Sequence, residues 1–257
     1  MIAVQTIAPR VTNRLRTYNA VAGLVHLLQA IAVLFLTNDF SIPVTAVFME
    51  GPPGTDATKV TTLFDFRIGW GVAVFLLMSA TAHLLLITPG VFQWYVRQLE
   101  TSRNYARWVE YSLSSSLMVV LIALLPGITD ISALIALFGV NAAMILFGLL
   151  MEKYEQPGNP SWTSYWFGVL AGSVPWIAIA FYLWTPGSIA NPPIFVYVIF
   201  VSLFLFFNSF SLNMILQYRQ TWRWRNYLYG EYVYILLSLT AKSLLAWQIF
   251  AGTLAVD

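Results

Sequence analysis

The chain has 257 residues, of which 59% are hydrophobic and only 9% are charged. Soluble domains carry about 25% charged residues, so this chain lacks the polar surface that would cover a water-soluble globule. Its 13 basic and 11 acidic residues give a net charge of +2, too small to imply an acidic partner. The composition excludes a soluble enzyme, a disordered chain and a nucleic-acid binder with a basic surface, and it indicates an integral membrane protein.

The composition also limits the available chemistry. The chain has no Cys, which excludes disulfides, cysteine nucleophiles, iron–sulfur clusters and thiolate zinc sites. It has two His, which argues against a multi-histidine metal centre. The first apolar segment is long and no small-residue cleavage site follows it, so we expect a spanning helix there and not a signal peptide.

Long apolar segments divide the chain. A bilayer-spanning helix needs about 20 predominantly apolar residues, and clusters of Pro and Gly separate most of the segments of this length. The sequence therefore predicts an all-α membrane protein, with the whole chain, residues 1–257, forming one bundle of seven transmembrane helices. The predicted spans are residues 18–36, 68–87, 108–125, 131–151, 162–184, 193–217 and 232–256.

Lys and Arg are distributed unevenly over the loops. Two of them, Lys59 and Arg67, fall on the side opposite the N-terminus, and Lys242 falls inside a span. Basic residues gather in cytoplasmic loops, so we expect the N-terminus in the cytoplasm and the C-terminus outside. The ten on the side of the N-terminus are Arg10, Arg14, Arg16, Arg97, Arg103, Arg107, Lys153, Arg219, Arg223 and Arg225.

The longest loop, residues 37–67, joins the first two spans on the predicted external side. It contains β-prone fragments such as residues 42–48. We expect a short hairpin that lies over the external face.

The seven predicted spans contain two formal charges, Glu110 in the third and Lys242 in the seventh. Each costs about 2.5–3.5 kcal/mol at a helix centre, so each needs a reason to be there. At a rise of about 1.5 Å per residue, Lys242 lies about 15–18 Å from the cytoplasmic start of its helix. Its side chain leans toward the level of Glu110, so the two can pair. Ser114 and Ser238 lie one turn from these charges on the same faces.

Two interpretations of this pair remain open. It can be a buried salt bridge or a substrate site, although burial offsets much of the gain from such a bridge. Alternatively, the lysine amine condenses with an aldehyde to a Schiff base, whose protonated form needs a buried counter-ion such as Glu110. Met144 and several aromatic side chains lie at suitable depths for a ligand, although each would ordinarily face lipid or pack in the core: Trp176, Phe206, Phe207 and Trp247.

Both histidines, His26 and His83, fall in the cytoplasmic half of adjacent spans, near the level of Glu110. They either satisfy neighbouring groups or form a hydrogen-bonded cluster that accepts a proton. Their spacing gives no support for a metal site. Because the sequence offers no buried ionisable group between the bundle centre and the outer surface, transmembrane transport is disfavoured.

The sequence around both charges resembles the heliorhodopsin family. Residues 107–116 read RWVEYSLSSS and residues 238–248 read SLTAKSLLAWQ. The similarity runs along the whole chain and includes the long first external loop and the inverted orientation. The joint occurrence of Glu110, the serine-rich continuation, Lys242, His26 and His83 is specific to this resemblance.

The resemblance implies a rhodopsin-like photoreceptor in the cell membrane, with all-trans-retinal bound to Lys242 as a protonated Schiff base. Glu110 matches the family's counter-ion, with Ser114 and Ser238 near it, and His26 and His83 match a pair in a cytoplasmic-side polar cavity. It also implies a homodimer in the lipid bilayer that senses light without net ion transport, with an unknown cytoplasmic signalling partner. The positions that match the retinal pocket are Asn141, Met144, Phe206 and Trp247.

Three other classes of function are kept as alternatives. A light-driven proton channel or pump would use the same chromophore, and some viral relatives are reported as proton-conducting channels. A non-photoactive membrane transporter or receptor would use Glu110 and Lys242 as a substrate or structural pair. A membrane enzyme ranks lowest, because the chain has too few clustered His, Asp or Cys for an intramembrane metalloprotease.

Overall fold

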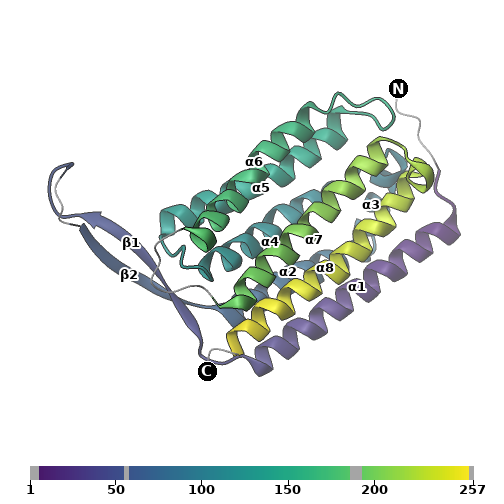
Figure 1. The fold of residues 1–257 in the computed structure, drawn as a ribbon. Coiled ribbons are helices and arrows are strands. Elements are labelled where there is room, and N and C mark those ends of the chain that lie inside the picture. The colour runs from purple at the N-terminus through teal and green to yellow at the C-terminus, as the bar shows by residue number, and fades with distance from the viewer. Residues whose placement is uncertain (1–5, 55–57, 186–192, 255–257) are drawn as a thin grey trace.

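The computed structural model describes residues 6–54, 58–185 and 193–254. Seven of its helices are long and apolar enough to cross a membrane, and each overlaps one of the predicted spans. The predicted all-helical, seven-span architecture is therefore confirmed (Figure 1). These helices are α1 (Pro9–Leu36), α2 (Ile68–Leu86), α4 (Tyr105–Leu124), α5 (Ile131–Tyr154), α6 (Thr163–Trp184), α7 (Ile194–Tyr218) and α8 (Tyr227–Leu254).

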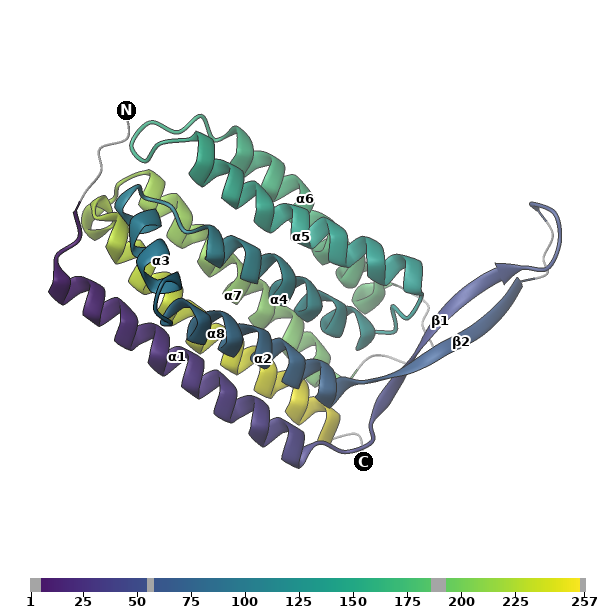
Figure 2. The ribbon, with the colours of Figure 1, turned by 180° about the vertical axis from the view of Figure 1, so that it is seen from behind.

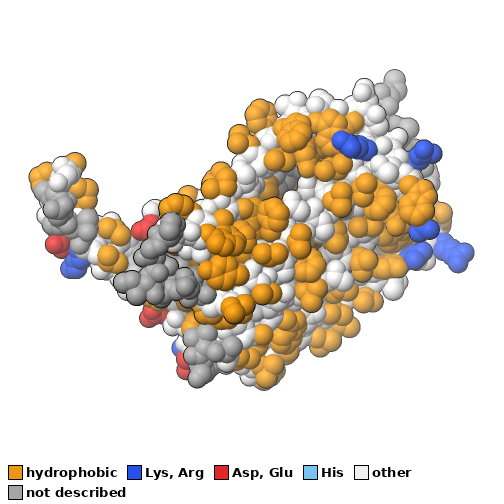
Figure 3. Space-filling view, in the orientation of Figure 1, with side chains coloured by type: hydrophobic (Ala, Val, Ile, Leu, Met, Phe, Trp, Pro, Cys, Tyr) orange, Lys and Arg blue, Asp and Glu red, His pale blue; other side chains and the backbone are white. Residues whose placement is uncertain are grey.

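The seven helices run side by side, and α1 begins at one end of the bundle while α8 ends at the other (Figure 1). We call the end at which α1, α4, α6 and α8 begin the N-terminal end, and the other the hairpin end. Hydrophobic side chains cover the visible side of the bundle, whereas Lys and Arg gather at the N-terminal end (Figure 3). This distribution is typical of a multi-pass membrane protein.

Two further helices lie at the N-terminal end and were not predicted. They are α3 (Val91–Glu100) and the short 3-10 helix η1 (Trp222–Arg225). In α3, Phe92, Tyr95 and Leu99 share one face, and Tyr95 and Leu99 are buried against the ends of α1, α2 and α8. The helix therefore covers this end of the bundle through an amphipathic pattern of period 3.6 (Figure 2).

The loop between α1 and α2 forms a hairpin of two antiparallel strands, β1 (Ser41–Met49) and β2 (Thr58–Arg67). Its base is fixed to the bundle, because the Thr45 backbone N–H donates a 2.9 Å hydrogen bond to the Thr129 carbonyl and Val44 is buried. The hairpin then extends away from the bundle, with Val47 and Phe48 exposed (Figures 1 and 2). The expected hairpin is therefore present, and the part of it near the bundle packs on the hairpin end, where Ile42 and Phe66 contact the core.

The helices differ in how deeply they are packed. In the most apolar 18-residue window of α4, 72% of residues are buried, against 17% in α7. Polar side chains on α4 therefore face other helices and not lipid. At the hairpin end Asp130 caps α5 by accepting hydrogen bonds from the Ser132 and Ala133 backbone N–H groups. The Ser132 hydroxyl, which also donates to this carboxylate, lowers the pKa of Asp130 below its ordinary value.

Candidate functional site

Lys242 on α8 and Glu110 on α4 meet inside the bundle. The Lys242 Nζ atom lies 2.6 Å and 2.8 Å from the two carboxylate oxygens of Glu110. Only 6% and 10% of the two side chains are exposed, so this is a buried ion pair. Lys242 also donates 2.9 Å hydrogen bonds to the hydroxyls of Ser79 on α2 and Ser114 on α4. Three helices therefore converge on one amine.

Helix geometry explains this convergence. Lys242 and Glu110 lie on helices that both begin at the N-terminal end, and side chains lean toward the start of their helix. The long lysine side chain therefore reaches back to the level of Glu110, while Ser114 lies one turn after Glu110 on the same face. The amine also lies 4.5 Å from the ring centroid of Tyr111, a favourable cation–π distance.

A second group of hydrogen-bonded polar side chains begins at Ser238, one turn before Lys242 on α8. The ring nitrogens of His83 lie 2.7 Å from Asn19 Oδ1 and 3.2 Å from the Ser238 hydroxyl oxygen. Because the amide oxygen of Asn19 can only accept, His83 Nδ1 donates, and Nε2 of the neutral ring accepts from Ser238. The rings of His26 and His83 stack with their centroids 6.0 Å apart. The two histidines therefore belong to one buried group on α1, α2 and α8.

A small cavity joins these two polar groups. It has a volume of about 30 Å³ and is lined by Glu110, His83 and Asn19, and, farther toward the N-terminal end, by Arg107 and Glu231. A cavity of this size with several polar partners can hold a water molecule. The carboxylate beside Lys242 and the His83 side chain thus face the same small cavity.

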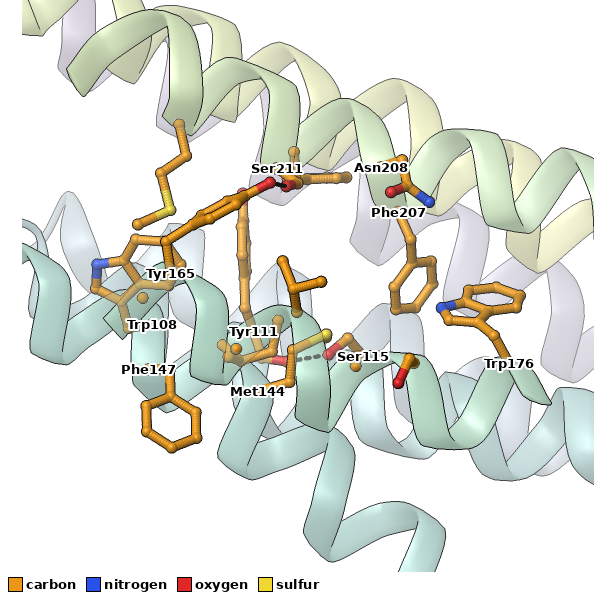
Figure 4. Close-up of a pocket in the computed structure, with 18 of the residues that line it drawn as sticks. Trp108, Tyr111, Ser115, Met144, Phe147, Tyr165, Trp176, Phe207, Asn208 and Ser211 are labelled. Carbon is orange, nitrogen blue, oxygen red and sulfur yellow. Dashed lines mark hydrogen bonds between the residues drawn. The ribbon is translucent and has the colours of Figure 1, made fainter. Parts of the chain in front are cut away.

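A larger cavity of about 530 Å³ lies between α4, α5, α6, α7 and α8, and Lys242 forms part of its wall. Most of its lining is apolar or aromatic, as Figure 4 shows for Met144, Trp176 and Phe207. Ligand pockets for small apolar molecules have volumes of about 300–1,000 Å³ and few polar groups. The cavity therefore has the size and lining of a site for an apolar molecule, with Lys242 in its wall.

The predicted pocket residues lie at different places around this cavity. Met144 lines it, and so do Trp176 and Phe207. Asn141 lies behind the wall and donates hydrogen bonds of 2.9 Å and 3.1 Å to the hydroxyls of Ser115 and Ser116. Among the described residues that line the cavity, neither Phe206 nor Trp247 is found, and Trp247 packs edge-on against Phe250.

The structure adds polar residues that sequence reasoning missed. Ser79 contacts both members of the ion pair from α2, and no spacing along one helix could have indicated this. Arg107, Glu152 and Glu231 form a second buried group of charges at the N-terminal end. Each lies one residue outside a predicted span, at the end of a long apolar segment.

The structure is that of a seven-helix membrane protein with a buried lysine–carboxylate pair at the wall of an apolar cavity. A lysine amine is a group that reacts with carbonyl compounds. The comparisons with known proteins agree with this description. The model of the heliorhodopsin family matches residues 15–254. The chain belongs to the heliorhodopsin family, and the resemblance seen in the sequence is confirmed. No curated protein matches the chain.

Proposed function

We propose that this protein is a light-sensing receptor in which all-trans-retinal is bound to Lys242 as a protonated Schiff base. The observation that carries the proposal is the position of the Lys242 amine. It forms part of the wall of the 530 Å³ apolar cavity and at the same time contacts both carboxylate oxygens of Glu110. Membership of the heliorhodopsin family, a family of retinal proteins, supports the same assignment.

The size and lining of the cavity support this cofactor. Retinal is a hydrocarbon with a single aldehyde, and the cavity is mostly apolar with the amine at its wall. Met144, Trp176 and Phe207 would hold the hydrocarbon part, and we keep Asn141, Phe206 and Trp247 as further predicted contacts. When bound, retinal supplies light absorption and isomerisation.

The residues of the chain perform the remaining chemistry. Lys242 would hold the retinal through a C=N bond to its side-chain nitrogen, in the chemistry that a lysine amine offers to an aldehyde. Glu110, which contacts this nitrogen in the structure, would balance the positive charge of its protonated form. Ser79 and Ser114, each 2.9 Å from Nζ, orient the pair.

The neighbouring polar groups provide a place for the proton after light absorption. The small cavity brings Glu110 and His83 together, and His83 is bonded to Ser238 and Asn19. We infer that the proton moves from the Lys242 nitrogen into this group, which includes His26, and later returns. The local change of charge then shifts the helices at this end between two states.

The distribution of buried charge supports sensing without net transport. Among the described residues, every buried Asp, Glu, His, Lys and Arg lies at the level of Lys242 or nearer the N-terminal end. The hairpin end contains a closely packed apolar core that includes Met118, Leu121 and Phe250. A pump needs groups that load and release a proton on both sides of the switch.

We also propose the surroundings in which the receptor works. The basic residues at the N-terminal end favour a cytoplasmic position for it, and Arg-rich loops there would meet a cytoplasmic signalling partner. The protein would lie in the cell membrane as a homodimer. The orientation is inferred from the distribution of basic residues, and the homodimer and the signalling partner from the resemblance to the family.

An absorption spectrum of the purified protein expressed with all-trans-retinal tests the function, with Lys242→Ala as the control. We expect a visible band in the native protein and none in the variant. A folded native protein with no visible band would contradict the proposal. Light-induced current across a membrane would favour a pump or channel instead of a receptor.

A further inference from the structure

A second group of buried charges lies where α4, α5 and α8 meet at the N-terminal end of the bundle. The two terminal nitrogens of Arg107 form ion pairs with Glu152 Oε1 and Glu231 Oε1. The exposed fractions of the three side chains are 4%, 1% and 1%. One guanidinium group therefore pairs with two carboxyl groups, and all three side chains are buried away from solvent.

The other carboxyl oxygens are also held in place. The Asn104 backbone N–H donates a 2.8 Å hydrogen bond to Glu152 Oε2, and its side-chain amide donates one of 2.8 Å to Glu231 Oε2. The Tyr227 hydroxyl donates to Glu152 Oε1 at 3.1 Å. The two carboxyl groups thus lie on either side of Arg107 in similar surroundings, and neither is turned toward solvent.

The charges in this cluster do not balance if both carboxyl groups are ionised. Arginine keeps its single positive charge in proteins, so the net charge would be −1. Among the described residues of α3, α7 and α8, the titratable groups that face the cluster are phenols, which add no positive charge: Tyr95, Tyr218, Tyr227 and Tyr234. His83 on α2 lines the adjoining small cavity, but its ring nitrogens are bonded to Asn19 and Ser238 and not to the cluster. Among the described residues, neither carboxylate forms an ion pair with a second Lys, Arg or His. An unbalanced charge in such a place is costly.

We propose that this cluster is a second proton-holding site, in which Glu152 and Glu231 share one proton in the dark. With this proton the cluster is neutral, and Arg107 is bonded to one carboxylate and one carboxylic acid. The site is separate from Glu110, whose charge is balanced by the Lys242 nitrogen. The chain therefore keeps two protons buried at different depths along the bundle.

The cluster is also placed to respond to light, a step that rests on the proposed function. Arg107 and Glu231 line the same small cavity of about 30 Å³ as Glu110 and His83. Because Glu110 and the cluster face the same cavity inside the bundle, where charges are weakly screened, a change of charge at Glu110 alters the electric field at the shared proton. Illumination would change the hydrogen bonding of the carboxylic acid.

Infrared spectroscopy of the purified protein tests the dark-state site, in a detergent that contains no carbonyl group and at neutral pH. A protonated carboxyl group gives a C=O stretching band that ionised carboxylates lack. We expect this band in the native protein and its complete loss in both Glu152→Gln and Glu231→Gln, because either change leaves one carboxylate for one guanidinium. If the native protein has no such band, or if the band survives in either variant, the proposal is overturned.

Three further variants test whether the C=O band belongs to this cluster and not to another carboxyl group. Glu110→Gln and Glu155→Gln should retain the band, since Glu110 is paired with Lys242 and Glu155 is held by the backbone N–H groups of Trp162 and Ser164. Glu231→Asp preserves the charge and should retain a band at a shifted frequency. Loss of the band in Glu110→Gln would assign the proton to that residue and overturn the proposal.

The light-minus-dark spectrum separates this proposal from the proposed function. A shift of the same C=O band on illumination of the retinal-bound protein, absent in Glu231→Gln, is the expected result. A retinal-bound protein whose illumination leaves this band unchanged would overturn the coupling. If the native protein binds no retinal, the receptor function fails, while the dark spectrum still decides whether the cluster holds a proton.

Discussion

Ser79 and Glu110 lie on different helices, yet the Ser79 hydroxyl donates a 2.9 Å hydrogen bond to Glu110 Oε1. The same hydroxyl oxygen accepts a 2.9 Å hydrogen bond from Lys242 Nζ. Ser79 is itself fully buried on α2. A third helix therefore fixes the orientation of the ion pair between α4 and α8.

Replacing Ser79 with Ala should shift the visible band without abolishing it. The variant keeps Glu110 but removes one of the hydrogen bonds that stabilise its charge, and such a bond to a charged group contributes about 1.5–3 kcal/mol. Ser112→Ala is the matched control, because the Ser112 hydroxyl donates to the Val109 carbonyl of its own helix and, among the described residues, to no member of the ion pair. If Ser79→Ala and Ser112→Ala both give the native spectrum, Ser79 does not orient the counter-ion.

Replacing Glu110 with Gln should change the spectrum more strongly. A neutral amide cannot balance the positive charge of the Lys242 nitrogen, so a larger fraction of the protein should absorb in the near ultraviolet at neutral pH. The remaining visible band should also move. Absorption spectra of this variant beside Glu155→Gln check the prediction, and a native spectrum for Glu110→Gln would remove Glu110 as the counter-ion.

Gly148 should be far less tolerant of a side chain than Gly139 on the same helix. A Cβ atom at Gly148 would lie 2.4 Å from the Trp108 ring, whereas at Gly139 it would meet nothing within 4 Å. Trp108 lines the large cavity, so Gly148→Ala should displace this wall, alter the visible band and cost about 1–3 kcal/mol of stability.

Gly139→Ala is the control for this change. It should leave the spectrum unchanged and gain up to about 1 kcal/mol from helix propensity. Thermal unfolding and absorption spectra of the two variants give the comparison. Equal effects of the two substitutions would show that Trp108 does not pack against α5 as described.

The orientation in the membrane can be measured because the chain has no Cys. A single cysteine placed by Lys59→Cys in β2 should react with a membrane-impermeant maleimide in intact cells. One placed by Gln93→Cys in α3 should react only after the cells are permeabilised. The reverse pattern would contradict a cytoplasmic N-terminus.

Much of this architecture could be predicted, because spanning helices are marked by length and hydropathy alone. The pairing of Lys242 with Glu110 also followed from depth, since both helices start at the same end. The α3 helix was missed although Phe92, Tyr95 and Leu99 carry its signal at helical spacing. A search for long apolar runs does not detect a short amphipathic helix.

Contacts between helices could not be predicted in the same way. The rotation of each helix decides whether a side chain such as Ser79 or Phe206 faces the cavity, and hydropathy does not define rotation in a bundle that is apolar on all sides. Arg107 was counted with the basic residues of the loops, and Glu152 and Glu231, which also lie just outside the predicted spans, were not singled out. Only the structure shows that these three charges satisfy one another inside the bundle.

The central claim is that Lys242 carries retinal. Reduction of the illuminated, retinal-bound protein with borohydride converts a Schiff base into a stable amine, and mass spectrometry of the resulting peptides then locates it. We predict a retinyl group on Lys242 and on neither Lys59 nor Lys153, the other lysines of the chain. A retinyl group on one of those two residues, or on none, would contradict the account.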